Sequence, residues 1–232
     1  PRWASGVGFT DYRNNVIYNW GYNSCYGGER IEDSYPDQYN SFTVNMVANY
    51  YKPGPATEPG QVSHRIASPA FDPESDIHGK WHVEGNFMEG NPAVSADNWD
   101  GGIQTKDDQM AMKKLKLDQP WPSMPVNQQT AKEAYHVVLA NAGATLPSRD
   151  PVDARIIQET REGIATFEGA GYKETKKVAN PEITCGIIDS QRDVGGWPEL
   201  ESEPAPRDSD HDGMPDNWEI ANGLNIEDAT DR

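Results

Sequence analysis

The chain has 232 residues, and its 37 acidic and 20 basic residues give a formal net charge of −17 at pH 7. This charge argues against nucleic acid or an anionic membrane surface as a general partner, and no stretch approaches the ~20 apolar residues of a membrane span. Hydrophobic residues make up only 35%, beside 21 glycines and 18 prolines, which indicates a loop-rich β protein rather than a helical bundle.

Three segments in the first hundred residues share one pattern: an apolar or aromatic residue, an asparagine three positions later, and then strand-forming residues. The asparagines are Asn15, Asn49 and Asn86. Repeats of about 20 to 50 residues are typical of solenoids. A parallel β-helix explains the spacing, because an asparagine at the same turn of each coil can adopt αL and hydrogen-bond to its neighbours. We therefore expect an internal ladder of amides; the alternative is chance recurrence in an Asn-rich sequence.

Helical patterns follow after about residue 105. Thr130 and Glu133 form a capping box that predicts a helix ending before Gly143. Asp150 and Pro151 predict the start of a second helix, which ends at Gly163. We expect both helices to pack on the solenoid and cover its edges. Residues 183–189 have the pattern of one further short strand or of a return segment.

The region from Asp208 to Glu219 has the spacing of a calcium loop, D-x-D-x-D-G-x5-E. A hard cation needs about six or seven oxygen ligands at one point. The predicted ligands are the side chains of Asp208, Asp210 and Asp212, the Met214 carbonyl, Asp216 through water, and both oxygens of Glu219.

Two prolines before this loop argue against an entering helix, so the unit is half an EF-hand. It resembles the loops of dockerins and thrombospondin type 3 repeats, which implies a structural Ca²⁺ ion and a secreted, extracellular or periplasmic protein. The alternative is a solvated acidic linker. We expect three parts: β-helix rungs over 1–128, a helical and loop segment packing on them over 129–200, and a calcium-binding tail over 201–232. Whether Cys25 and Cys185 pair stays open.

Several stretches resemble bacterial family 1 polysaccharide lyases, the pectate lyase group. They are residues 9–20, 26–29, 49–55, 83–87, 142–156 and 195–198, and the calcium tail also resembles appended tails of this group. The resemblance implies an all-β fold: a right-handed parallel β-helix with C-terminal helices packed on it and an EF-hand-like calcium loop. It also implies calcium-assisted β-elimination of polygalacturonate (pectin), in which acidic side chains hold calcium and an arginine removes a proton.

The sequence departs from the family at its catalytic motif, R-x-P-x-x-R. Pro1 matches the proline, Ala4 stands where the second arginine is expected, and the leading arginine and the acidic calcium ligands would precede Pro1. We expect Arg2 to act at the catalytic position, and Arg30, Lys52 and Tyr26 to bind substrate; for each, an ordinary packing role is the alternative. We further expect either a missing N-terminal segment or self-association to cover the first edge of the β-helix.

Two rival interpretations remain. One is a non-catalytic pectin- or carbohydrate-binding β-helix, favoured by the incomplete arginine motif. The other is a different β-helix enzyme of pectin metabolism, which would use aspartate clusters; Asp107 and Asp108 lie in a lysine-rich loop and are poor candidates.

Overall fold

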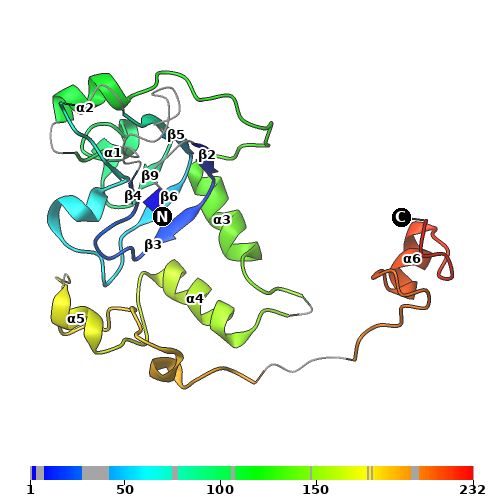
Figure 1. The fold of residues 1–232 in the computed structure, drawn as a ribbon. Helices are drawn as coiled ribbons and strands as arrows, with labels where there is room; N and C mark the ends of the chain where they lie inside the picture. Colours follow the sequence, from blue (N-terminus) through cyan, green and yellow to red (C-terminus); the bar gives the residue numbers. More distant parts are fainter. Residues whose placement is uncertain are drawn as a thin grey trace. The chain divides into compact units, whose positions relative to one another are not determined.

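The computed structural model describes residues 2–3, 8–27, 42–74, 78–105, 108–146, 148–176, 178, 180–199 and 204–231. The chain forms two compact units, Pro1–Trp197 and Pro198–Arg232 (Figure 1). Arg30 and the Asp107 position lie outside the described residues.

The first unit contains short parallel strands in three sheets of three. The strands are β1 (Arg2–Trp3), β2 (Gly8–Arg13), β3 (Val16–Tyr18), β4 (Tyr26–Gly27), β5 (Phe42–Val47), β6 (Tyr50–Lys52), β7 (Ser68–Pro69), β8 (Lys80–Glu84) and β9 (Phe87–Met88). The sheet orders are β1-β4-β7, β2-β5-β8 and β3-β6-β9, and all pairs are parallel. Consecutive strands thus enter the three sheets in turn, so each coil adds one strand to every sheet. This arrangement is compatible with the expected parallel β-helix.

The asparagine ladder is confirmed. The side-chain amide of Asn15 donates to Oδ1 of Asn49 at 2.9 Å, and that of Asn49 donates to Oδ1 of Asn86 at 2.8 Å. A fourth member, Asn98, which the repeat pattern does not reveal, accepts from Asn86 at 2.9 Å. Asn49, Asn86 and Asn98 are all buried, and the ladder satisfies polar groups that would otherwise be costly in a core.

The left-handed backbone conformation lies one residue earlier than we expected. It is adopted by Asn14, Ala48 and Gly85, with φ of 56°, 52° and 67°, and not by the ladder asparagines that follow them. The ladder residues therefore supply side-chain hydrogen bonds, while their predecessors make the turn of the chain.

One hydrophobic core fills the interior of the coils. Its largest fully buried side chains include Trp81, Tyr51, Met46 and Met88. The Tyr51 hydroxyl donates to the sulfur of Met46 at 3.3 Å, so the polar tip of this tyrosine is also satisfied inside the core. Cys25 is part of the same cluster; Cys25 and Cys185 are both buried and no disulfide joins them.

Six α-helices occur among the described residues, more than the all-β label implies. They are α1 (Pro92–Ala96), α2 (Asp108–Leu115), α3 (Ala131–Asn141), α4 (Pro151–Glu162), α5 (Gly171–Thr175) and α6 (Asp216–Asn222), with 3-10 helices η2 (Gly60–His64) and η3 (Gln191–Val194). None of the described helices is long and apolar enough to cross a membrane.

The two long helices begin and end where the sequence predicts. Thr130 and Glu133 form the capping box of α3. Asp150 caps α4, and Gly163 ends that helix in αL with φ of 75°. Helix α3 packs on the sheet β3-β6-β9, where Tyr135 stacks on Tyr50 with ring centroids 4.2 Å apart (Figure 1).

Two irregular segments also cover the first unit. Trp121 exchanges two 2.8 Å hydrogen bonds with the side chain of Asn45 and stacks on Phe9, so the segment between α2 and α3 runs along the outside of β2-β5-β8. Residues 183–189 form no strand; they are a return segment, and Asn19 donates to the Cys185 carbonyl at 2.8 Å.

The second unit consists of an acidic loop followed by α6. Gly223 ends this helix in αL with φ of 77°, as the sequence predicts. The described residues before the loop, 204–207, are not helical, so a two-helix EF-hand is not shown.

Candidate functional site

The sheet β1-β4-β7 places Arg2, Tyr26 and Ser68 side by side. The register pairs Arg2 with Tyr26 and Tyr26 with Ser68. Gly27 and Pro69, the next residues along these strands, are buried, whereas Tyr26 is exposed. Because successive strand residues alternate between faces, Tyr26 and Ser68 belong to an outer row, and Arg2 has the register position of that row.

A cleft of about 400 Å³ lies beside this row. Tyr26, Ser68, Arg65 and Gln104 contribute to its lining. The Arg65 guanidinium donates from Nε to Oε1 of Gln104 at 2.7 Å and lies over the ring of Tyr22 at 5.3 Å. The cleft thus combines a positioned guanidinium, an aromatic ring and amide and hydroxyl groups, which is a suitable set for a sugar acid.

Arg65 was not among the residues predicted from the sequence. It follows the short helix η2 and lies outside the repeated asparagine pattern, and its partner Gln104 is 39 residues away. Only the stacking of coils brings the two together. A single arginine in a loop has no sequence pattern that would distinguish a binding residue from an ordinary surface residue.

The structure does not bring Lys52 to this face. Lys52 lies on β6, in a different sheet, and is buried. Its Nζ donates to Oε1 of Glu89 at 2.9 Å, and Gly163 at the end of α4 lies close to its side chain. The expected contact of Lys52 with a substrate carboxylate therefore has no structural support, because the helices cover this part of the sheet.

A second cavity, of about 320 Å³, lies beside β8, the end of α1 and the segment that follows α2. Its lining includes His82, Glu84, Lys116 and Asp118. His82 Nε2 lies 3.2 Å from Oε2 of Glu84. None of the site residues predicted from the sequence lines this cavity.

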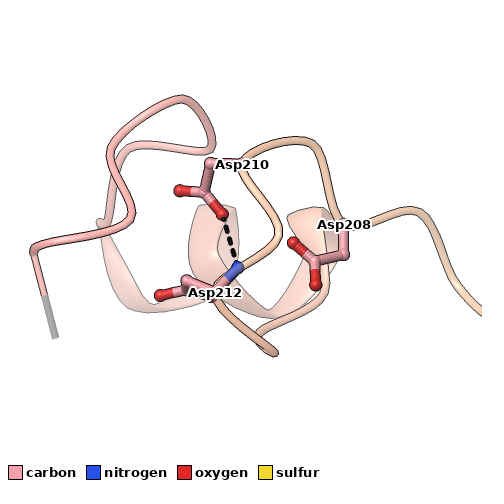
Figure 2. A group of neighbouring side chains, drawn as sticks. All are labelled: Asp208, Asp210 and Asp212. Carbon is pink, nitrogen blue, oxygen red and sulfur yellow. Dashed lines mark hydrogen bonds between the residues drawn. The ribbon is translucent and has the colours of Figure 1, made fainter.

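The acidic loop of the second unit forms a candidate metal centre. Ligand atoms of Asp208, Asp210 and Asp212 lie within 4.8 Å of one another (Figure 2). Backbone amides hold the carboxylates in place: His211 donates to Asp208 at 2.8 Å, and Asp212 donates to Asp210 at 3.3 Å. Gly213, with φ of 96°, makes the sharp turn that the pattern requires.

Several carboxylate oxygens around this loop are buried without a hydrogen-bond partner. They are Oδ2 of Asp210, Oδ2 of Asp212, both Oε atoms of Glu219, and Oδ1 of Asp231. Burial, followed by the charges of Asp210, Asp212, Asp231 and Asp216, raises the pKa of Glu219. Burial and the neighbouring charges of Asp212 and Asp208 likewise raise the pKa of Asp210. Buried carboxylates that repel one another fit a divalent cation, which would supply the missing positive charge.

Both side-chain oxygens of Asp216 make contacts within the tail, and its expected water-mediated contact to an ion stays a prediction. Its Oδ1 accepts the Ser209 amide at 2.7 Å, and its Oδ2 accepts the Ser209 hydroxyl at 2.8 Å. Arg207 Nε lies 3.4 Å from the same Oδ2. Asp216 therefore joins the start of the loop to the first turn of α6. Glu219, by contrast, is fully buried with both oxygens available for an ion.

Comparison with known proteins gives a consistent set of relatives, although no family model matches the chain. A probable pectate lyase C of Aspergillus terreus is 28% identical over 223 residues, covering 93% of this chain and 42% of that protein. A probable pectate lyase C of Emericella nidulans is 27% identical over 227 residues, covering 97% and 44%. One from Aspergillus fumigatus is 26% identical over 213 residues, covering 91% and 41%. The chain thus spans less than half the length of these curated relatives. Their similarity over nearly the whole chain supports a family relationship between this protein and the pectate lyases.

Proposed function

We propose that this chain carries part of the substrate-binding face of an extracellular pectate lyase. The enzyme would cleave polygalacturonate by calcium-assisted β-elimination on a right-handed parallel β-helix. The observation that supports this most directly is the cleft beside the row of Arg2, Tyr26 and Ser68, with the guanidinium of Arg65 held at its edge. The relatives named probable pectate lyase C support the same activity.

The positive charge of Arg65, which lines this cleft, matches a polymer of sugar acids. Polygalacturonate carries a carboxylate on every residue, and a guanidinium binds carboxylates in two parallel hydrogen bonds. The net charge of −17 disfavours such a polyanion over most of the protein surface. Productive binding therefore needs local cations: Arg65 lines the cleft beside Tyr26, and Arg2 pairs with Tyr26 in the strand register.

The proposed reaction removes the proton from C5 of a galacturonate, breaks the C4–O4 bond and forms a C4–C5 double bond. The departing O4 takes up a proton. Arg2 is our proposed catalytic residue, acting at or beside the proton-abstracting position. Because the pKa of free arginine exceeds 12, we expect the rate to rise with alkaline pH. Calcium bound to the substrate carboxylate would stabilise the charge that develops at C5.

Incubation of the protein with polygalacturonate and calcium tests this proposal. Elimination gives an unsaturated product whose ultraviolet absorbance grows with time, and a chelator should stop the growth. Arg65→Gln and Tyr26→Ala should each weaken polygalacturonate binding, measured by affinity electrophoresis. Lys132→Gln is the matched control, because Lys132 is exposed and lies over Phe87, on the sheet β3-β6-β9. Equal effects of the three substitutions would contradict the assignment of the face.

A non-catalytic pectin-binding β-helix is the second candidate. It is favoured by one sequence feature: Ala4 stands at the place of the second arginine in R-x-P-x-x-R. Retained, Arg65-dependent binding without any absorbance change would support this candidate. Release of reducing ends without the absorbance change would instead identify a hydrolase.

A further inference from the structure

We propose that the second unit binds one calcium ion with ligands from both sides of α6, and that Asp231 supplies a ligand from outside the twelve-residue loop. No part of the loop pattern includes Asp231, which follows Glu219 by twelve residues. The inference concerns the tail and is independent of the proposed lyase activity.

The first observation is the state of Glu219. Its side chain is fully buried, with a relative exposure of 0%, and neither carboxylate oxygen has a hydrogen-bond partner. Leaving an ionised carboxylate in this state is very unfavourable unless an opposite charge compensates it. Glu219 therefore points to a cation independently of the cluster of Asp208, Asp210 and Asp212.

The second observation is that the two carboxylate oxygens of Asp231 differ in their hydrogen bonding. Its Oδ2 accepts the backbone amide of Asn225 at 2.6 Å, which fixes the side chain. Its Oδ1 is buried and has no partner. Asp231 is also close enough to Glu219 to act on it electrostatically. The arrangement is that of a carboxylate held by one oxygen with the other left for an ion.

No protein cation is in a position to neutralise these groups within the described part of the tail. Residues 198–232 contain no lysine, and Arg207 is mostly exposed and paired with Asp216. Among the described residues of the tail, the buried carboxylates of Asp210, Asp212, Glu219 and Asp231 thus have no cationic side chain that compensates them.

The number of oxygens favours calcium over magnesium. The three loop aspartates give three ligands, the Met214 carbonyl one, and Glu219 two; Asp231 would be the seventh. Calcium accepts about six to eight oxygens in an adaptable geometry, whereas magnesium requires a near-ideal octahedron and keeps several waters. A ligand from Asp231 would also tie the segment after α6 to the loop before it. The Leu224 amide donates to the Glu219 carbonyl at 2.9 Å, and the amide of the next residue, Asn225, donates to Asp231 Oδ2. These two neighbouring amides connect Glu219 with Asp231.

The test uses the full chain and calcium alone. Calcium affinity is measured by competition with a chromophoric chelator for the wild type, Asp231→Asn, Asp228→Asn and Glu219→Gln. Glu219→Gln removes a buried charged ligand of the tail, so the calcium affinity that remains in this variant measures binding elsewhere in the chain. Asp228→Asn is the matched control, because Asp228 is exposed and its Oδ1 accepts from the Thr230 amide and hydroxyl, contacts that asparagine can keep.

We expect Asp231→Asn to weaken calcium binding by the tail at least about ten-fold, as is common when a group that supports a metal site is replaced. Asp228→Asn should leave the affinity unchanged. Since asparagine can still accept the Asn225 amide, the Leu224 and Asn225 amide resonances at saturating calcium should stay close to their wild-type positions.

A second measurement on the wild type decides the matter even if Asp231→Asn disturbs the tail. The carboxyl carbon resonance of Asp231 should move in step with that of Glu219 as calcium is added, while that of Asp228 should not. An unmoved Asp231 resonance, or equal affinities for Asp231→Asn and Asp228→Asn, would overturn the proposal.

Discussion

The side-chain amide of Asn49 donates to Oδ1 of Asn86 at 2.8 Å, and the same oxygen accepts the Asn49 backbone amide at 2.9 Å. Asn15 makes the corresponding pair of bonds to Asn49, and Asn86 makes them to Asn98. Each step of the ladder therefore uses one oxygen twice. A shift of the register between coils would leave these buried donors without acceptors, so the ladder aligns the coils as well as stabilising them.

Asn86→Asp should destabilise the first unit by about 3 kcal/mol or more, because it places a charge in the core and leaves buried groups unpaired. Aspartate keeps the acceptor for Asn49 but loses the donors to Asn98 Oδ1 and the Met46 carbonyl. Urea unfolding would measure the free-energy difference. Asn91→Asp is the control: Asn91 caps α1 by accepting from Val94, and aspartate caps as well as asparagine. Similar losses in the two variants would contradict the role of the ladder.

Ala48→Gly and Gly85→Ala should change stability in opposite directions. Ala48 has φ of 52°, where a residue with a Cβ is strained by about 1–2 kcal/mol, so glycine should stabilise the fold by up to about 1 kcal/mol. Gly85 has φ of 67°, and a Cβ there would meet nothing nearer than 3.9 Å. Alanine at this position should thus cost only the backbone strain, about 1–2 kcal/mol. Thermal unfolding of both variants tests the prediction, and a loss in both would refute it.

Glu168 should make the return segment sensitive to acid. The Lys173 ammonium, and then the Cys185 amide, lower the pKa of Glu168 by hydrogen bonds. A carboxyl group with a depressed folded-state pKa stabilises the fold above its unfolded pKa, and this contribution is lost as pH falls through the folded pKa. Glu168→Gln should therefore be less stable than the wild type near neutral pH, and the difference should shrink in acid. Stability curves between about pH 7 and 3 would show this.

Glu174→Gln serves as the comparison for that experiment. Glu174 is exposed on α5, close in sequence to Lys173. Its variant should follow the wild-type stability at every pH. A constant offset for Glu168→Gln, independent of pH, would show that its effect comes from packing rather than from charge.

Asp216→Asn should weaken calcium binding by the tail much less than Glu219→Gln. Both oxygens of Asp216 are engaged by Ser209, whereas those of Glu219 have no protein partner. Asparagine retains an oxygen for the Ser209 amide, while Glu219→Gln removes a buried charged ligand. Calorimetric titration of the two variants with calcium would compare them. Equal losses of calcium affinity in the two variants would show that Asp216 belongs to the ligand set, as the loop pattern predicts.

The sequence pattern predicts the repeated parts of this fold well. The spacing of Asn15, Asn49 and Asn86 reveals the coils, and the caps at Thr130 and Asp150 reveal the two long helices. Asn98 escapes the pattern because it follows Asn86 by only 12 residues, after the short helix α1.

Contacts between segments that are distant in the sequence could not be predicted from it. The sequence places Lys52 beside a predicted strand as a candidate substrate-binding residue, but helices cover its sheet and an ion pair with Glu89 fixes it. The proposed role of Arg65 depends on its contact with Gln104 across coils, and the proposed role of Asp231 depends on the fold of the chain beyond α6. A one-dimensional pattern can predict a periodic or contiguous set of residues, but it contains no information on which single side chains meet across coils.

The ladder steps of 34 and 37 residues differ by three, yet both give the same two hydrogen bonds. Chain length between successive anchor points is thus free to vary, provided that the anchors themselves return to the same place. Insertions into the connecting loops would enlarge or reshape the outer surface and leave the alignment of the interior intact. An architecture of this kind can acquire new specificity by lengthening its loops, with little change in its stability.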